Sequence, residues 1–251
     1  NVSSQYLTAL LIAGPLCNQT IKTQIIGELI SKPYIDITLK LLAQFGIKYK
    51  NNKWKDFTLK APSRFKSPKK IRVEGDASSA SYFFAAGAIA GSVEVININK
   101  SSIQGDLEFL KVIEKMGANI EYLSNSIKVS KNRRLIGMTI DCKNIPDAAM
   151  TLAILALFAK GTTTLKSIAS WRIKETDRIF AMKTELKKLG ALVTSSKSSI
   201  TIKPPKMINN NITINTYDDH RMAMCFSLVC LSNRNIIIND PECTNKTYPN
   251  F

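Results

Sequence analysis

The chain has 251 residues, of which 45% are hydrophobic and 22% are charged, and its formal net charge is +16. This composition is typical of a soluble globular protein and argues against a disordered or fibrous one. The longest apolar run, residues 148–159, is too short to span a bilayer, so we expect a soluble, cytoplasmic protein that does not bind membranes. Five scattered cysteines and a single histidine form no metal-ligand spacing, which predicts reduced thiols and no metal site.

The positive charge leaves two interpretations open. A positive field steers either nucleic acid or an acidic small molecule towards a protein. Many of the lysines, however, stand beside asparagine or isoleucine in polar turns such as residues 51–55, as AT-biased codon usage alone would give. The charge by itself therefore assigns no partner.

In chain order, the predicted elements form a repeat. Three apolar helices each have an acidic residue at their start, and these residues are Asp76, Asp147 and Asp219, which are 71 and 72 positions apart. A strand-like run follows each helix, at residues 93–98, 163–165 and 236–238. The helix after Asp147 is apolar all round and has to be buried.

A second series of helices interleaves with the first. These helices are amphipathic and end at Gly46, Gly117 and Gly190, so they should cover the outside of the fold. Two short strands follow each glycine, at residues 47–49 and 57–59, 118–122 and 127–129, and 192–194 and 200–202. The predicted fold is α/β (α+β), built from βαβαββ units of about 72 residues with buried inner helices.

The start of the chain and a polar segment predict the domain organisation. Residues 3–16 have the character of an inner helix without the strand that should precede it, so we expect an N-terminally truncated fragment. The polar, proline-containing residues 61–70 look like a crossing between two lobes. The predicted domains are a remnant of the N-terminal lobe, residues 1–74, and a C-terminal lobe of about three units, residues 75–251.

The stretch WRIKETDR, residues 171–178, gathers charges at the start of the helix that ends at Gly190. Asp177 or Thr176 is the expected N-cap. Because a helix N-terminus attracts anions and Lys174 and Arg178 add positive charge, we expect an anionic ligand. A solvated, salt-bridged helix start is the alternative.

Six motifs carry a family resemblance. They are SKPYIDITL (31–39), EGDASSASYF (74–83), IPDAAMT (145–151), WRIKETDR (171–178), YDDHRMAM (217–224) and CTNKTYP (243–249). In this order they closely resemble 3-phosphoshikimate 1-carboxyvinyltransferase, or EPSP synthase, of the bacterial type. The resemblance implies a monomer with the two-lobed enolpyruvyl transferase fold, of which the first lobe is incomplete here, and neither a metal nor an organic cofactor.

The resemblance also implies an activity. Members of this family transfer the enolpyruvyl group of phosphoenolpyruvate to the 5-hydroxyl of shikimate 3-phosphate and release phosphate, a step of the shikimate pathway to chorismate and the aromatic amino acids. The implied partners are these two small anions rather than nucleic acid. Because the cations of the missing lobe are absent, we expect the fragment alone to be inactive.

Individual residues take their roles from this resemblance. Asp147, beside the 5-hydroxyl, and Glu175, placed to exchange the methyl proton, form the implied acid–base pair. The residues implied to bind shikimate 3-phosphate are Ser3, Ser4, Gln5, Ser31, Tyr34, Asp147, Ser170 and Lys174. Those implied to bind phosphoenolpyruvate are Gln5, Arg178, Arg221 and Lys246.

Some of these assignments have alternatives. Asp147 could serve as an N-cap, a role that is compatible with catalysis. Ser170 stands where the family often has an asparagine, so a shorter side chain or a water would replace that contact. His220, beside Arg221, is expected to support the site from a helix start rather than to touch the substrate.

Three other functions stay open. UDP-N-acetylglucosamine enolpyruvyl transferase uses the same donor, but it lacks the pairing of KETDR with DDHRMAM, and its reactive cysteine has no counterpart here. The chain could also be a catalytically incomplete fragment. A basic nucleic-acid-binding protein is the third, which only the net charge supports.

Overall fold

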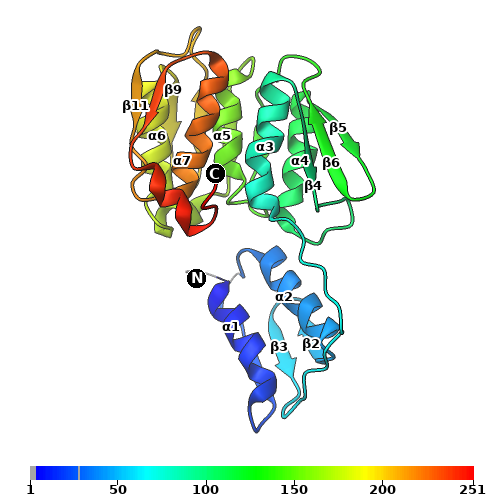
Figure 1. Cartoon of the computed structure of the whole chain (residues 1–251). Helices are drawn as coiled ribbons and strands as arrows, with labels where there is room; N and C mark the ends of the chain where they lie inside the picture. The colour runs from blue at the N-terminus through cyan, green and yellow to red at the C-terminus, as the bar shows by residue number, and fades with distance from the viewer. Residues whose placement is uncertain (1–3, 28) are drawn as a thin grey trace. The chain divides into compact units, whose positions relative to one another are not determined.

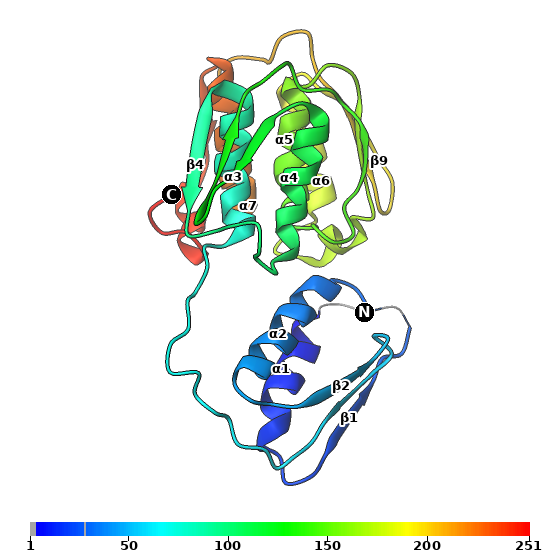
Figure 2. The same ribbon diagram turned by 90° about the vertical axis from the view of Figure 1, so that its right-hand side faces the viewer.

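The computed structural model describes residues 4–27 and 29–251. The chain divides into two units, Asn1–Glu74 with Ile103–Gly105, and Gly75–Ser102 with Asp106–Phe251. Residues 60–74 form neither helix nor strand, and Figure 2 shows this segment as an extended cyan trace. None of the helices within the described residues is both long and apolar enough to cross a membrane.

The first unit consists of two helices and a small antiparallel sheet. Its elements are α1 (Gln5–Ala13), β1 (Ile21–Gln24), α2 (Lys32–Gln44), β2 (Tyr49–Asn52) and β3 (Asp56–Leu59), with a short 3-10 helix, Gly14–Leu16, after α1. The strand order is β1-β3-β2. Leu11, Ile35 and Phe57 are at the centre of its core, whereas Tyr6 and Leu10 of α1 are more than half exposed.

Three inner helices organise the second unit. They are α3 (Ala77–Ala90), α5 (Ala149–Phe158) and α7 (His220–Ser227), and Figure 1 shows them side by side. Residues 149–157 of α5 are all buried, as its wholly apolar sequence predicts.

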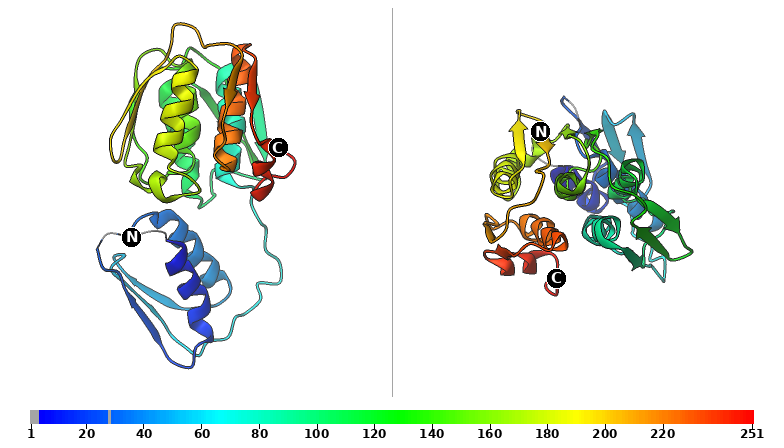
Figure 3. Two further views of the ribbon diagram at one scale, coloured as in Figure 1. Left: turned by 90° about the vertical axis from the view of Figure 1, so that its left-hand side faces the viewer. Right: turned by 90° about the horizontal axis from the view of Figure 1, so that it is seen from above.

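The outer elements of this unit surround the inner helices. The helices are α4 (Glu108–Met116) and α6 (Arg178–Lys188). The strands are β4 (Ser92–Ile96), β5 (Asn119–Tyr122), β6 (Ser126–Ser130), β7 (Thr139–Asp141), β8 (Thr163–Lys166), β9 (Leu192–Ser195), β10 (Ile200–Lys203), β11 (Ile212–Ile214) and β12 (Ile236–Ile238). They form three sheets in the orders β4-β6-β5, β7-β8-β10-β9 and β11-β12. The C-terminal 3-10 helix η5 (Pro241–Lys246), red in Figure 3, lies against α7.

The predicted repeat is confirmed by the order β7-α5-β8-α6-β9-β10. Three strands that the sequence pattern did not reveal are β1, β7 and β11, which are only three or four residues long. The strand expected at residues 47–49 is wrong in its bounds, since β2 begins at Tyr49. The N–H of Ile47 instead donates to Leu42 O in the turn that ends α2, where Gly46 has a φ of +76°.

Candidate active site

The candidate site lies where the N-terminal ends of α5, α6 and α7 meet, and the segment before α6 contributes Lys174 and Glu175. This segment is the 3-10 helix η3 (Ala169–Ile173) and the residues that follow it. The fully buried Trp171 donates its indole N–H to Pro146 O at 2.7 Å. This hydrogen bond therefore fixes the segment that contains Lys174 and Glu175 next to the turn that contains Asp147.

Arg178, the first residue of α6, is the centre of the site. Its Nε and Nη2 donate to the two oxygens of Asp219 at 2.7 and 3.2 Å, Nη1 donates to Asp147 at 3.0 Å, and Nη2 also donates to Glu175 at 2.7 Å. The Arg178 side chain is only 1% exposed. The carboxylates of the described residues thus use four of its five N–H donors.

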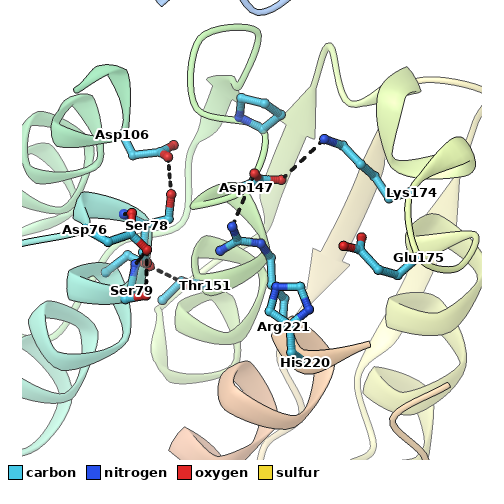
Figure 4. A network of polar contacts seen from close by, with 12 residues as sticks. Asp76, Ser78, Ser79, Asp106, Asp147, Thr151, Lys174, Glu175, His220 and Arg221 are labelled. Carbon is cyan, nitrogen blue, oxygen red and sulfur yellow. Dashed lines mark hydrogen bonds and ion pairs between the residues drawn. The ribbon is translucent and has the colours of Figure 1, made fainter. Parts of the chain in front are cut away.

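Asp147 bridges several cations. It accepts from Arg178. It also accepts from Arg221 Nη2 at 3.3 Å, and Lys174 Nζ lies 3.8 Å away (Figure 4). Burial opposes its ionisation, but the charges of Arg221, Lys174 and Arg178 outweigh burial and lower its pKa. Asp147 is therefore ionised at neutral pH.

The alternative that Asp147 serves as an N-cap is wrong. Helix α5 begins at Ala149, and its N-cap, Ala148, makes no side-chain cap hydrogen bond. The equivalent residues in the other repeats do cap, since Asp76 accepts from two N–H groups of α3 and Asp219 accepts from Arg221 N. The guanidinium groups of Arg178 and Arg221 outcompete the helix for the Asp147 carboxylate because they are charged donors. Asp177 is confirmed as the expected N-cap of α6, since its side chain accepts from Phe180 N.

Glu175 is held between two cations. Its oxygens accept from Arg178 Nη2 and from Lys246 Nζ, both at 2.7 Å. Burial would raise its pKa, but the hydrogen bond from Lys246 and the charge of Arg178 lower it from 4.5 to about 2. Lys246, at the end of η5, is 56% exposed, so this cation is accessible from solvent.

Arg221 has more N–H donors available for a ligand than Arg178 has. Its Nη1 donates to the Tyr82 hydroxyl at 3.2 Å and its Nη2 to Asp147. Its side chain is 13% exposed. In the described part of the chain, these two contacts leave three of its five N–H donors without an acceptor.

His220 is buried beside these residues at the start of α7. Its Nδ1 lies 3.7 Å from Asp219 Oδ1, and no described residue is within hydrogen-bond distance of it. His220 is thus at the helix start, as expected, but its Nδ1 supports no described residue of the site through a hydrogen bond. Burial and the charge of Arg221 lower its pKa, although Asp219 and Glu175 oppose this, so the imidazole is neutral at pH 7.

Those of the other predicted substrate-binding residues that the structure describes lie in helices or just before them. Ser170, in η3, is partly exposed. In the first unit, Gln5 is the first residue of α1, and Ser4 is at the N-cap position but makes no side-chain cap bond. Ser31 precedes α2 with a φ of +55°, and Tyr34 is in the first turn of α2. Ser3 lies outside the described residues.

The structure adds two residues that the sequence did not assign to the site. Asp219 was expected only as a helix start, yet its fully buried carboxylate also orients Arg178. Tyr82 was expected only as an apolar residue of an inner helix. Within the described residues, no three histidine, cysteine or acidic side chains are grouped so that they could hold a metal ion.

Comparisons with known proteins agree with this arrangement. The family model of EPSP synthase (3-phosphoshikimate 1-carboxyvinyltransferase) matches residues 1–251. Curated relatives with the name 3-phosphoshikimate 1-carboxyvinyltransferase are 53% identical over 252 residues in Shewanella pealeana and 54% identical over 254 residues in Neisseria meningitidis. Both alignments cover the whole chain, and the chain spans 59% of each relative's length.

Solved structures are similar as well. EPSP synthase from Acinetobacter baumannii has a TM-score of 0.82 and 25% identity over 98% of this chain and 58% of its own. The enolpyruvyl transferase NikO from Streptomyces tendae has a TM-score of 0.72 at 14% identity, covering 98% of this chain and 57% of its own, which shows the shared fold alone. The predicted enolpyruvyl transferase fold is thereby confirmed, and the curated relatives favour the EPSP synthase resemblance over the UDP-N-acetylglucosamine alternative. The chain belongs to the EPSP synthase (3-phosphoshikimate 1-carboxyvinyltransferase) family.

Proposed function

We propose that the protein transfers the enolpyruvyl group of phosphoenolpyruvate to the 5-hydroxyl of shikimate 3-phosphate and releases phosphate. The observation that carries this proposal is the pair of ionised carboxylates, Asp147 and Glu175, hydrogen-bonded to one buried arginine and facing three further cations. The family of the chain and the names of its relatives support the choice of substrates.

The reaction needs proton transfers at two positions, the hydroxyl oxygen and the methylene carbon, and such a pair can perform them. The 5-hydroxyl loses a proton as its oxygen bonds to C2 of phosphoenolpyruvate, while the methylene carbon of phosphoenolpyruvate gains a proton. The tetrahedral intermediate then returns a proton from the new methyl group and expels phosphate, which regenerates the carbon–carbon double bond. We assign Asp147 to the hydroxyl and Glu175 to the methyl group, since positioned carboxylates are effective general acids and bases.

The cations of the cluster suit the anionic donor. Arg221 has free N–H donors in the planar arrangement that matches a carboxylate, so we assign it to the carboxylate of phosphoenolpyruvate. The exposed Lys246 is assigned to its phosphate. Arg178 is assigned to the same carboxylate through its remaining N–H. Its other N–H groups include those that donate to Asp147 and Glu175 and fix the positions of these two carboxylates.

The pKa of Glu175 connects binding with proton transfer. A carboxyl group with a pKa of about 2 is a poor acid donor near pH 7, because it is almost never protonated. When a substrate phosphate draws Lys246 away, Glu175 loses the partner that lowers its pKa most and gains a negative neighbour. Substrate binding therefore raises the Glu175 pKa towards the range in which it can deliver a proton.

The remaining substrate residues are proposals from the family resemblance. We assign Lys174, which lies 3.8 Å from Asp147, and Ser170 of η3 to shikimate 3-phosphate, together with Gln5, which we also assign to phosphoenolpyruvate. The hydroxyl groups of Ser4, Ser31 and Tyr34 complete the same set, and Ser3 is retained with them.

Phosphate release, measured with the whole protein that contains this chain and separately with the 251-residue chain, tests the proposal. We expect the whole protein to release phosphate only when phosphoenolpyruvate and shikimate 3-phosphate are both present, and the 251-residue chain to release none. Turnover with UDP-N-acetylglucosamine in place of shikimate 3-phosphate, or no turnover by the whole protein, would contradict the proposed function.

A further inference from the structure

Tyr82 has a polar contact that its place in the core does not explain. It lies in α3, is 1% exposed and packs its ring against Phe251 at a centroid distance of 6.0 Å. Its hydroxyl nevertheless accepts a hydrogen bond from Arg221 Nη1, 139 positions further along the chain. A phenylalanine would fill the same space, so the hydroxyl has a role other than packing.

The contact fixes one end of the Arg221 guanidinium. Nη1 is bound to Tyr82 from α3, and Nη2 is bound to Asp147 from the turn before α5, while Arg221 itself belongs to α7. A planar group that is hydrogen-bonded at both Nη atoms cannot rotate about its Cζ–Nε bond without breaking one contact. Tyr82 and Asp147 together therefore set the plane in which the remaining N–H donors point.

We propose that Tyr82 is a positioning residue that orients Arg221 for the carboxylate of the donor substrate. The inference rests on the proposed function for the identity of that substrate. Burial raises the pKa of Tyr82, so the phenol stays neutral and its oxygen keeps its lone pairs for the arginine. Neutrality also suits the site, because a neutral acceptor does not cancel the positive charge that attracts the substrate.

A separate set of buried polar side chains, which does not include Tyr82, connects the three inner helices. Ser81 Oγ of α3 lies 2.8 Å from Thr151 Oγ1 of α5, which in turn lies 3.8 Å from Cys225 Sγ of α7. All three side chains are fully buried, and burial raises the pKa of the Cys225 thiol to about 12, so this set carries no charge at neutral pH. Removal of the Tyr82 hydroxyl should therefore release Arg221 without moving the helices.

Tyr82→Phe tests the inference because it removes only the hydroxyl. In the whole protein, we expect the KM for phosphoenolpyruvate to rise roughly tenfold, the worth of one hydrogen bond to a charged group, while the KM for shikimate 3-phosphate stays within about twofold. The matched control is Tyr122→Phe, in strand β5, because this residue is 39% exposed. An unchanged KM for phosphoenolpyruvate in Tyr82→Phe, or an equal rise for both substrates with a lower melting temperature, would overturn the inference.

Side-chain NMR of the 251-residue chain separates this inference from the proposed function, because it needs no substrate. With ¹⁵N-labelled arginine, we expect the Nη groups of Arg221 to rotate more slowly in the wild type than in Tyr82→Phe. Identical Arg221 signals in the two chains would overturn the positioning role. If the wild-type whole protein releases no phosphate from phosphoenolpyruvate, the proposed function is wrong. The Arg221 NMR signals of the wild type and of Tyr82→Phe still decide the positioning role of Tyr82.

Discussion

Arg178 and Arg221 belong to one cluster, but their surroundings give them different roles. Arg178 is 1% exposed and its donors are taken by three carboxylates, of which Asp219 is fully buried. Arg221 is more exposed and has donors left for a ligand. At the scale of single residues, a buried charge whose donors are nearly all paired contributes mainly to the folded state, whereas a charge with several spare donors is suited to binding.

This difference predicts that the same substitution acts mainly on stability at Arg178 and mainly on substrate binding at Arg221. Arg178→Lys keeps the charge but loses the forked contact with Asp219, so we expect it to lower the free energy of unfolding by about 1–3 kcal/mol. Arg221→Lys should cost less stability and should mainly raise the KM for phosphoenolpyruvate. Denaturant unfolding beside steady-state kinetics distinguishes the two, with the exposed Arg134→Lys as control. Equal losses of stability would show that both arginines are structural.

The free energy of unfolding should also depend on pH through the ionisation of Glu175. The pKa of this carboxyl is about 2 in the folded protein against 4.5 for an ordinary glutamate, so the unfolded chain takes up a proton first as the pH falls. Its stabilising contribution is complete above about pH 4.5 and is lost between pH 4.5 and pH 2, and the lowered pKa of Asp147 acts in the same direction. Glu175→Gln should flatten this part of the curve of unfolding free energy against pH, and Glu121→Gln, on an exposed position, should not. A slope that Glu175→Gln leaves unchanged would contradict the ion pairs described here.

Sequence alone predicts local contacts of these residues better than distant ones. The N-caps Asp76, Asp177 and Asp219 were predictable because a short polar side chain bonds N–H groups within three residues of itself. Asp147 binds Arg178 and Arg221, which are 31 and 74 positions away. No local sequence pattern therefore reveals that its carboxylate binds these arginines instead of capping α5. For Tyr82, whose partner is still more distant, the apolar neighbours concealed the polar contact.

At the scale of elements, the inner helices are specified by composition, whereas some of the short strands have no recognisable sequence pattern. Helix α5 is apolar on every side, so it has to be buried. The three-residue strands β7 and β11 are too short for a period-two pattern and are stabilised by parallel pairing with β8 and β12. Such strands depend on the fold that surrounds them.

Close packing of α3 on its sheet gives a prediction at this scale. A Cβ atom at Gly87 would lie 2.5 Å from Val129 O of β6, so Gly87→Ala forces the helix and the sheet apart. We expect a net loss of roughly 1–2 kcal/mol, because the clash outweighs the better helix propensity of alanine. Gly91→Ala is the matched control, since Gly91 has an extended φ of 175° and no atom within 4 Å of the added methyl group. Equal stability of the two variants in thermal melts would contradict the described packing.

At the scale of the whole molecule, the two units differ in the size of their cores. The first unit has a small core and leaves apolar side chains of α1 exposed, whereas the second buries three inner helices. Because stability grows with the apolar area removed from water, the second unit should be the more stable.

Limited proteolysis measures this difference. Lys69 and Lys70 are exposed in a segment without helix or strand, so trypsin should cut there early. We expect a resistant product that begins after residue 70 and extends towards the C-terminus, while the first unit is degraded. First cleavage inside residues 106–251, identified by mass spectrometry, would show that the second unit is the weaker one.

The acid–base assignment is tested most directly by the rate of phosphate release in the whole protein carrying Asp147→Asn or Glu175→Gln. We expect kcat to fall by about 10²–10⁴-fold in each variant, because positioned proton transfer is lost, while the KM values change far less. Asp141→Asn, at an exposed position at the end of β7, should keep the wild-type kcat. A wild-type kcat in both Asp147→Asn and Glu175→Gln would contradict the assignment of these two carboxylates to the chemistry.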